Sequence, residues 1–222
     1  MVNQTQVALS DAAEWLGVWH PLSEQLGSAS GLVTLASVSA MLDLEPVHSV
    51  ATLRRFISRY HAQILVSVEW PAIRQAHYYA DRNGLRELVA LDQQLEGMPV
   101  FRRFSAPSQR VGQAQLQKLA PLRDQRLVQR YLAAVAGGQA RGWHMLVYGL
   151  TLSVYSLPLR QGLLGYAHQT TRGFIYSAAP MLRLSERECR WIFDTTCGSL
   201  PSAMELLLHL APESSPVESP ED

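Results

Sequence analysis

Apolar side chains recur three and four residues apart along most of this chain, and this spacing constrains the fold more than any other feature. The clearest series is Leu53, Phe56, Ile57, Tyr60, Ile64 and Val68, with arginines on the remaining positions. Residues spaced in this way share one face of an α-helix, which has about 3.6 residues per turn. No segment shows the strict alternation that is typical of a half-buried strand. The pattern predicts an all-α fold.

Residues that begin and end helices recur between the apolar stripes. Ser185 and Glu188 have the spacing of a capping box, and Asn83-Gly84 supplies the residues that commonly end a helix. Pro71 suits the first turn of a helix because the backbone N–H groups of that turn have no acceptor within the helix, so the N–H that proline lacks is not missed. The predicted helices are one opened by Asp11, then 32–42, 53–68, one with Pro71 in its first turn, 85–95, 109–119, 123–135, 143–155, one from Pro158, 185–198 and 201–210.

The sequence contains no internal repeat and no linker long enough to divide these helices. We therefore expect a single globular domain of about ten helices over residues 1–210. Residues 211–222 consist mainly of Pro, Ser and acidic residues, which cannot bury enough apolar surface to fold. This acidic C-terminal tail is predicted to be disordered.

Charge, cysteine content and hydropathy favour a cytoplasmic protein. The 19 basic and 19 acidic residues balance, so the whole molecule has no electrostatic reason to bind nucleic acid or a membrane. Cys189 and Cys197 are eight residues apart on one predicted helix, about 12 Å, which is too far for a disulfide. The uncharged stretch from Gly142 to Leu159 contains His144 and is too short to span a bilayer, so we interpret it as a buried helix.

The sequence lacks the common signatures of catalysis and of metal or cofactor binding. No two of the seven histidines have the spacing that places two imidazoles on one metal ion. There is no phosphate-binding glycine loop and no nucleophile elbow. We therefore predict no catalytic residue, no metal ligand and no cofactor.

Two alternatives remain open. His144, Tyr166 and His168 could line the pocket of a helical enzyme, although buried polar groups in a core are more common. The segment from Arg102 to Arg130 is basic, with Asp124 as its one acidic residue, and it could bind nucleic acid, bind an acidic protein surface or face solvent. Base stacking would need aromatic residues, which are limited there to Phe101, Phe104 and Tyr131.

Several short motifs, in their order along the chain, resemble the urease accessory protein family UreF. Ser108 and Gly112 match a Ser-x-Gln-x-Gly motif of that family, with Arg110 where Gln is usual. His144 and Gly149 stand at the start of the most apolar helix, as in the family. Tyr166 and the pair Ser177-Ala178 resemble the helix that follows. The resemblance covers Leu53 to Leu208.

The resemblance implies a non-catalytic scaffold that dimerises and binds neither GTP nor nickel tightly by itself. It would bridge a UreD- or UreH-type accessory protein and the GTPase UreG, so that nickel reaches apo-urease. The residues that would contact partners are Arg103, Ser108, Arg110, Gly112, Tyr166 and Ser177. The sequence departs from the family in 21–33, at Leu184-Ser185-Glu186 and in the acidic tail.

Overall fold

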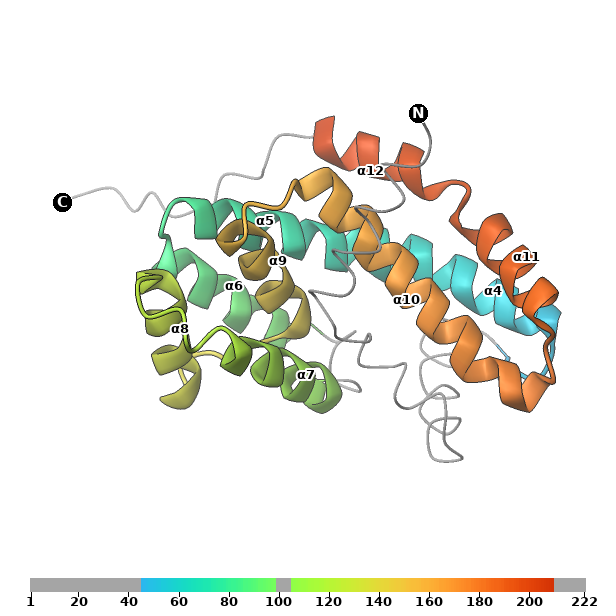
Figure 1. Cartoon of the computed structure of the whole chain (residues 1–222), viewed down its shortest axis with the longest axis horizontal. Helices are drawn as coiled ribbons and strands as arrows, with labels where there is room; N and C mark the ends of the chain where they lie inside the picture. The colour runs from blue at the N-terminus through green and yellow to red at the C-terminus, as the bar shows by residue number, and fades with distance from the viewer. Residues whose placement is uncertain (1–44, 99–104, 210–222) are drawn as a thin grey trace.

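A long, continuous helical run extends through the molecule (Figure 1). In the computed structural model, which describes residues 45–98 and 105–209, helix α4 (Val50–Tyr60) passes into a π-helix, η1 (His61–Glu69), and then into α5 (Trp70–Asp81). Ser49 begins the run, since its hydroxyl accepts a hydrogen bond from the Thr52 amide at 3.2 Å. The run ends at Asn83, whose φ of 55° is in the left-handed region.

The sequence predicted separate helices before and at Pro71, but the structure shows no interruption there. Pro71 lies in the first turn of α5, as expected, directly after the wider π-helical turns. In an α-helix a proline ring clashes with the carbonyl four residues earlier. In η1 the Trp70 amide donates to the Leu65 carbonyl, five residues back, so the backbone before Pro71 is wound more widely. The π-helix thereby lets the helical run continue through a proline.

Four helices form one half of the molecule. They are α6 (Leu85–Gly97), α7 (Ser105–Lys118), α8 (Arg126–Ala136) and α9 (His144–Val154). Two of them, α6 and α9, pack on α5, while α7 packs on α9 and α8 packs on α6 and α7. Helix α9 is buried on nearly all sides between α5 and α7 (Figure 1), as its uniform hydrophobicity predicted. Gly149 permits the close approach of α9 to α5, because a Cβ there would lie 2.5 Å from the Ile73 carbonyl oxygen.

Three helices cover the other end of the run. Helix α10 (Leu159–Leu182) crosses α4 and α5. Helices α11 (Glu186–Cys197) and α12 (Leu200–His209) both pack on α10, and α11 also packs on α4 and α12 on η1 (Figure 1). The predicted capping box at the start of α11 is present, with Ser185 and Glu188 exchanging side-chain and backbone bonds. Cys189 and Cys197 are both free and buried, in agreement with the sequence analysis.

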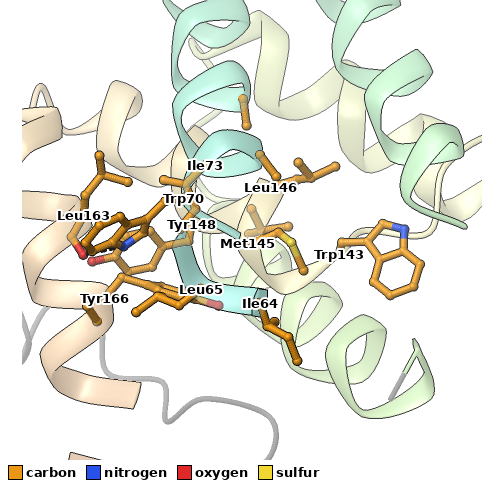
Figure 2. Close-up of a cluster of buried hydrophobic side chains, with 14 of the residues drawn as sticks. Ile64, Leu65, Trp70, Ile73, Trp143, Met145, Leu146, Tyr148, Leu163 and Tyr166 are labelled. Atoms are coloured by element: carbon orange, nitrogen blue, oxygen red, sulfur yellow. Dashed lines mark hydrogen bonds between the residues drawn. The ribbon is translucent and has the colours of Figure 1, made fainter. Parts of the chain in front are cut away.

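The core is continuous where η1, α5, α9 and α10 meet (Figure 2). Trp70, Leu163 and Tyr166 pack together there, and the Trp70 indole N–H donates to the Leu163 carbonyl at 3.0 Å. This single core confirms one all-α domain, and the described residues contain no strand. No helix in 45–98 or 105–209 is long and apolar enough to cross a membrane.

Most predicted boundaries agree with the structure to within a few residues. Helix α7 begins at Ser105, four residues before the predicted start, and α8 begins at Arg126, three residues after it. The helix opened by Asp11, the helix at 32–42 and the tail at 211–222 lie outside the described residues.

Candidate functional site

Basic side chains that lie on α7, on α8 and between them are all exposed. They are Arg110, Lys118, Arg123, Arg126 and Arg130. None forms a salt bridge with any residue in the described ranges, whereas Arg141 nearby pairs with Glu96 at 2.8 Å. Arg126 and Arg130 are one turn apart and therefore project from the same side of α8. We call these five residues the α7–α8 basic surface, and its charge suits an acidic partner.

The inner side of α7 is held by the motif that suggested partner contacts. Ser108 is buried, and its hydroxyl accepts a hydrogen bond from the His144 amide at the start of α9, at 3.3 Å. Gly112 is also buried, and a Cβ there would lie 2.1 Å from the Gly142 carbonyl oxygen. The motif therefore fixes α7 against α9, while Arg110 between the two residues faces solvent.

Asp92 of α6 fixes the loop that leads into α9. One carboxylate oxygen accepts a hydrogen bond from the Arg141 amide at 2.6 Å, and the other accepts bonds from the Tyr131 hydroxyl at 2.6 Å and the Gly142 amide at 2.9 Å. Its carbonyl also accepts a bond from the Trp143 indole at 3.1 Å. Burial raises the pKa of Asp92, and these hydrogen bonds oppose that shift because they favour the ionised form. The anchor holds α6, α8 and α9 together behind the basic surface.

Tyr166 belongs to a buried polar group at the other end of the core. Its hydroxyl donates to Glu69 Oε1 at 3.1 Å, and Tyr60 donates to the same oxygen at 3.0 Å. The pKa of Tyr166 is raised well above its usual value, first by burial and then by the charge of Glu69. Tyr166 is therefore a neutral donor in the core, and it is not exposed for partner contact.

The three residues of the alternative enzyme pocket do not converge. The His144 and Tyr166 rings are neighbours, with centroids 5.6 Å apart. His168 instead packs on Phe193 of α11, at 5.4 Å between centroids. Tyr166 and His168 are two residues apart on one helix, and such residues point in different directions. No group of His, Cys, Asp or Glu in the described ranges could hold a metal ion.

The remaining predicted contact residues are Ser177 and Arg103. Ser177 is partly buried on α10, which is not one of the helices of the α7–α8 basic surface. Arg103 lies outside the described residues. The structure therefore brings Ser108, Arg110 and Gly112 together on α7 and leaves Tyr166 and Ser177 elsewhere, and their role in partner binding stays a prediction.

The sequence patterns did not identify the two buried carboxylates, Asp92 and Glu69, as structural anchors. Asp92 stands inside the apolar series Leu88, Leu91 and Leu95, and Glu69 follows the apolar series that ends at Val68. An acidic residue on the apolar side of a helix is a usable signal, because burial of a charge needs dedicated hydrogen bonds. Most of the partners were not readable, since the donors to the Asp92 carboxylate are 39 to 50 residues away and Tyr166 is 97 residues from Glu69.

The described residues form an all-helical fold that carries the exposed α7–α8 basic surface. In a comparison with family models, the UreF model matches residues 47–192, which is well over half of the chain. The chain therefore belongs to the UreF family of urease accessory proteins, which is not a catalytic family. A comparison with curated proteins finds no match.

Proposed function

We propose that this protein is a cytoplasmic, dimeric scaffold for nickel insertion into apo-urease. It bridges a UreD- or UreH-type accessory protein and a UreG-type GTPase, and it contributes no catalytic residue. Membership of the UreF family supports the accessory role. A scaffold acts by raising the effective concentration of one partner near another, which needs complementary surfaces and no reactive side chain.

The observation that carries a binding role is the α7–α8 basic surface. Five cations are exposed there without a described ion-pair partner. They therefore break no described ion pair when an acidic surface binds. The helices beneath are rigidly held by Ser108, Gly112 and Asp92, so the charges keep their arrangement before binding. We propose that Arg110, together with Arg103, which precedes α7 by two residues in the sequence, contacts the acidic partner.

An acidic protein fits this surface better than nucleic acid does. Single-stranded nucleic acid binds through aromatic stacking as well as charge. Tyr131 is the one aromatic residue of the basic segment that is described, and it is buried with its hydroxyl on Asp92. The buried Tyr131 ring therefore cannot stack on a nucleic-acid base.

The test is reconstitution of urease activation from purified components. Adding the chain to apo-urease, the GTPase, the UreD-type protein, GTP and nickel should increase urease activity. The chain alone should neither hydrolyse GTP nor hold nickel stoichiometrically in equilibrium dialysis. Stoichiometric nickel binding by the chain alone, or equal urease activation without it, would refute the proposal.

The surface assignment needs a paired charge-reversal experiment. Arg110→Glu with Arg126→Glu should weaken capture of the acidic partner at least tenfold, because both changes replace attraction by repulsion. Arg59→Glu with Arg172→Glu is the matched control, since both arginines are exposed on the other half of the molecule. Equal capture by both double variants would show that the basic surface is not used.

A further inference from the structure

The α7–α8 basic surface carries more positive charge than the carboxylates beside it can balance. Its five cations are exposed, and Asp124 is the one carboxylate within residues 105–130. Helix α6, which packs on α8, adds the exposed carboxylates Glu87 and Glu96, but Glu96 is paired with Arg141 at 2.8 Å. An excess of positive charge therefore remains on this face, and it attracts acidic groups.

A segment of the opposite charge follows α12 in the sequence. The acidic tail, residues 211–222, has four carboxylate side chains and no basic residue. They are Glu213, Glu218, Glu221 and Asp222. The tail lies outside the described residues. Its charge is complementary to that of the α7–α8 basic surface, so the two attract each other.

Most of the other exposed arginines have carboxylates near them. On α4, Arg55 forms a salt bridge with Glu45 at 2.5 Å. Along α11 the exposed basic and acidic residues are interleaved, as Glu186, Arg187, Glu188, Arg190 and Asp194. Neighbouring charges of opposite sign largely cancel at a distance, whereas the five cations of the α7–α8 basic surface add. The α7–α8 basic surface therefore attracts the acidic tail more strongly than α4 or α11 does.

The acidic tail is long enough to reach this surface. Helix α12 ends at His209, and Arg74 of α5 donates a hydrogen bond to the Leu207 carbonyl at 2.7 Å. From there α6 packs on α5 and α8 packs on α6, an order that Figure 1 shows. Neighbouring helix axes lie about 8–10 Å apart, so α8 is about 30 Å from the end of α12. An extended chain spans about 3.3–3.6 Å per residue, so Glu218 and the residues after it can reach α8.

We propose that the acidic tail of this chain binds its own α7–α8 basic surface and thereby competes with the acidic partner protein for it. The proposal rests on the proposed function, because it assigns a regulator to the same surface. A tethered segment has an effective concentration of roughly millimolar, so even a weak contact keeps the surface partly occupied. The apparent affinity for the partner is proportional to the fraction of chains whose surface is unoccupied. Because the contact is between exposed charges, salt weakens it.

A zero-length cross-link tests the contact without any partner protein. Lys118 is the one lysine of the whole sequence, and it lies exposed on the α7–α8 basic surface. A carbodiimide activates a carboxylate and joins it to an adjacent amine as an amide. Mass spectrometry of the monomeric product should find Lys118 joined to Glu218, Glu221 or Asp222 at about 20 mM salt. The yield should fall at least about fivefold at about 0.5 M salt.

Charge reversal identifies the surface that the tail contacts. Arg110→Glu with Arg126→Glu should reduce the yield of the tail cross-link at least about fivefold, because the tail is then repelled. Arg59→Glu with Arg172→Glu is the matched control and should leave the yield unchanged, since both arginines are exposed on the other half of the molecule. Acetylation of Lys118 by a small reagent, at the same rate in every variant, shows that its amine stays reactive.

Competition is measured with a fluorescent polyglutamate peptide as an acidic probe of the basic surface. A full-length variant with a neutral tail should bind the peptide about threefold more tightly than the wild type at about 20 mM salt, and the difference should vanish at about 0.5 M salt. Its changes are Glu213→Gln, Glu218→Gln, Glu221→Gln and Asp222→Asn. The matched control neutralises four carboxylates of the described part and should change binding by less than about 1.5-fold. Its changes are Glu45→Gln, Glu186→Gln, Asp194→Asn and Glu205→Gln.

The outcomes separate this proposal from the proposed function. If Lys118 is acetylated normally but no tail cross-link forms, or if the neutral tail leaves peptide binding unchanged, tail docking is wrong and the scaffold function stands. A cross-link found only between isotopically heavy and light chains in a mixed sample would place the tail on a second copy and also overturn the proposal. Failure of the wild type to bind the purified UreD/UreH-type protein and the UreG-type GTPase would overturn the scaffold function, whereas the cross-link would still report the tail contact.

Discussion

Asp92 of α6 and Glu69 of η1 are both buried carboxylates, but they hold different parts of the molecule in different ways. Asp92 accepts hydrogen bonds on both oxygens, and two of its donors are backbone amides of the loop before α9. Glu69 accepts both of its tyrosine hydrogen bonds on Oε1, and these donors are side chains of α4 and α10. Asp92 therefore fixes the path of a loop, whereas Glu69 connects two helices that are already packed.

Because the two carboxylates hold different kinds of structure, substitutions at Asp92 and at Glu69 should have different effects. The loop that Asp92 holds lies against Gly112 of α7, which carries part of the α7–α8 basic surface. The helices that Glu69 connects include α4, whose Arg54 lies over the Trp191 ring of α11. A change at Asp92 should alter the chain path, and a change at Glu69 should alter mainly packing. Four predictions test this contrast.

Replacing Asp92 with alanine should give the largest loss of stability, at least about 3 kcal/mol, because three donors lose their acceptor. Asp92→Asn should lose roughly half as much, since the amide group still accepts hydrogen bonds on one side. Urea unfolding followed by circular dichroism measures both values. A loss of stability below about 1 kcal/mol for Asp92→Ala would remove the distinction between Asp92 and Glu69.

Gly112→Ala should cost about 1–3 kcal/mol, because the new methyl group meets the backbone at Gly142 and the loop must move. Gly97→Ala is the matched control at the end of α6, where a Cβ would have no neighbour within 4 Å. That control should be neutral or stabilising by up to about 1 kcal/mol. Equal stability of the two variants would show that α7 does not depend on its contact with the loop.

The region around Glu69 should lose stability in acid because the buried His61 becomes protonated there. Burial lowers the pKa of His61 to about 4, and this effect exceeds the opposing influence of the nearby Glu69 charge. The folded state binds the proton more weakly than the unfolded state does, so stability is complete above pH 6.5 and is lost as the pH falls toward 4. We expect a loss of roughly 2 kcal/mol between pH 7 and pH 5 from this group.

The variant His61→Gln should flatten this pH dependence, measured as the free energy of unfolding at several pH values. His48 is exposed, so His48→Gln should keep the slope of the wild type. An unchanged slope in His61→Gln would exclude His61 as the source of acid sensitivity.

Glu69→Gln should have the smallest effect, below about 1 kcal/mol, because the amide oxygen can accept from both tyrosine hydroxyls in place of Oε1. Thermal unfolding of Glu69→Gln, measured in parallel with that of Asp92→Asn, compares the two losses of stability directly. A loss equal to that of Asp92→Asn would mean that the charge of Glu69, and not only its acceptor oxygen, stabilises the core.

The sequence alone determined the fold class and most of the helices. Leu88, Leu91 and Leu95 lie on the buried side of α6, and Ser185 begins α11 as its capping box predicted. Local rules suffice for such features because a helix is specified by residues within a few positions of one another. The order of short motifs also indicated the UreF family, which the family model then matched over residues 47–192.

Tertiary structure decided what those residues do. Ser108 and Gly112 belong to a motif that predicted partner contacts, yet both are buried against the start of α9. His168 is separated from His144 and Tyr166 because helix geometry turns it toward α11. The pairing of Trp191 with Arg54 joins two helices that are distant in sequence. Spacing along a chain fixes which residues share a helix face, but only packing decides which face meets solvent and which distant side chains become neighbours.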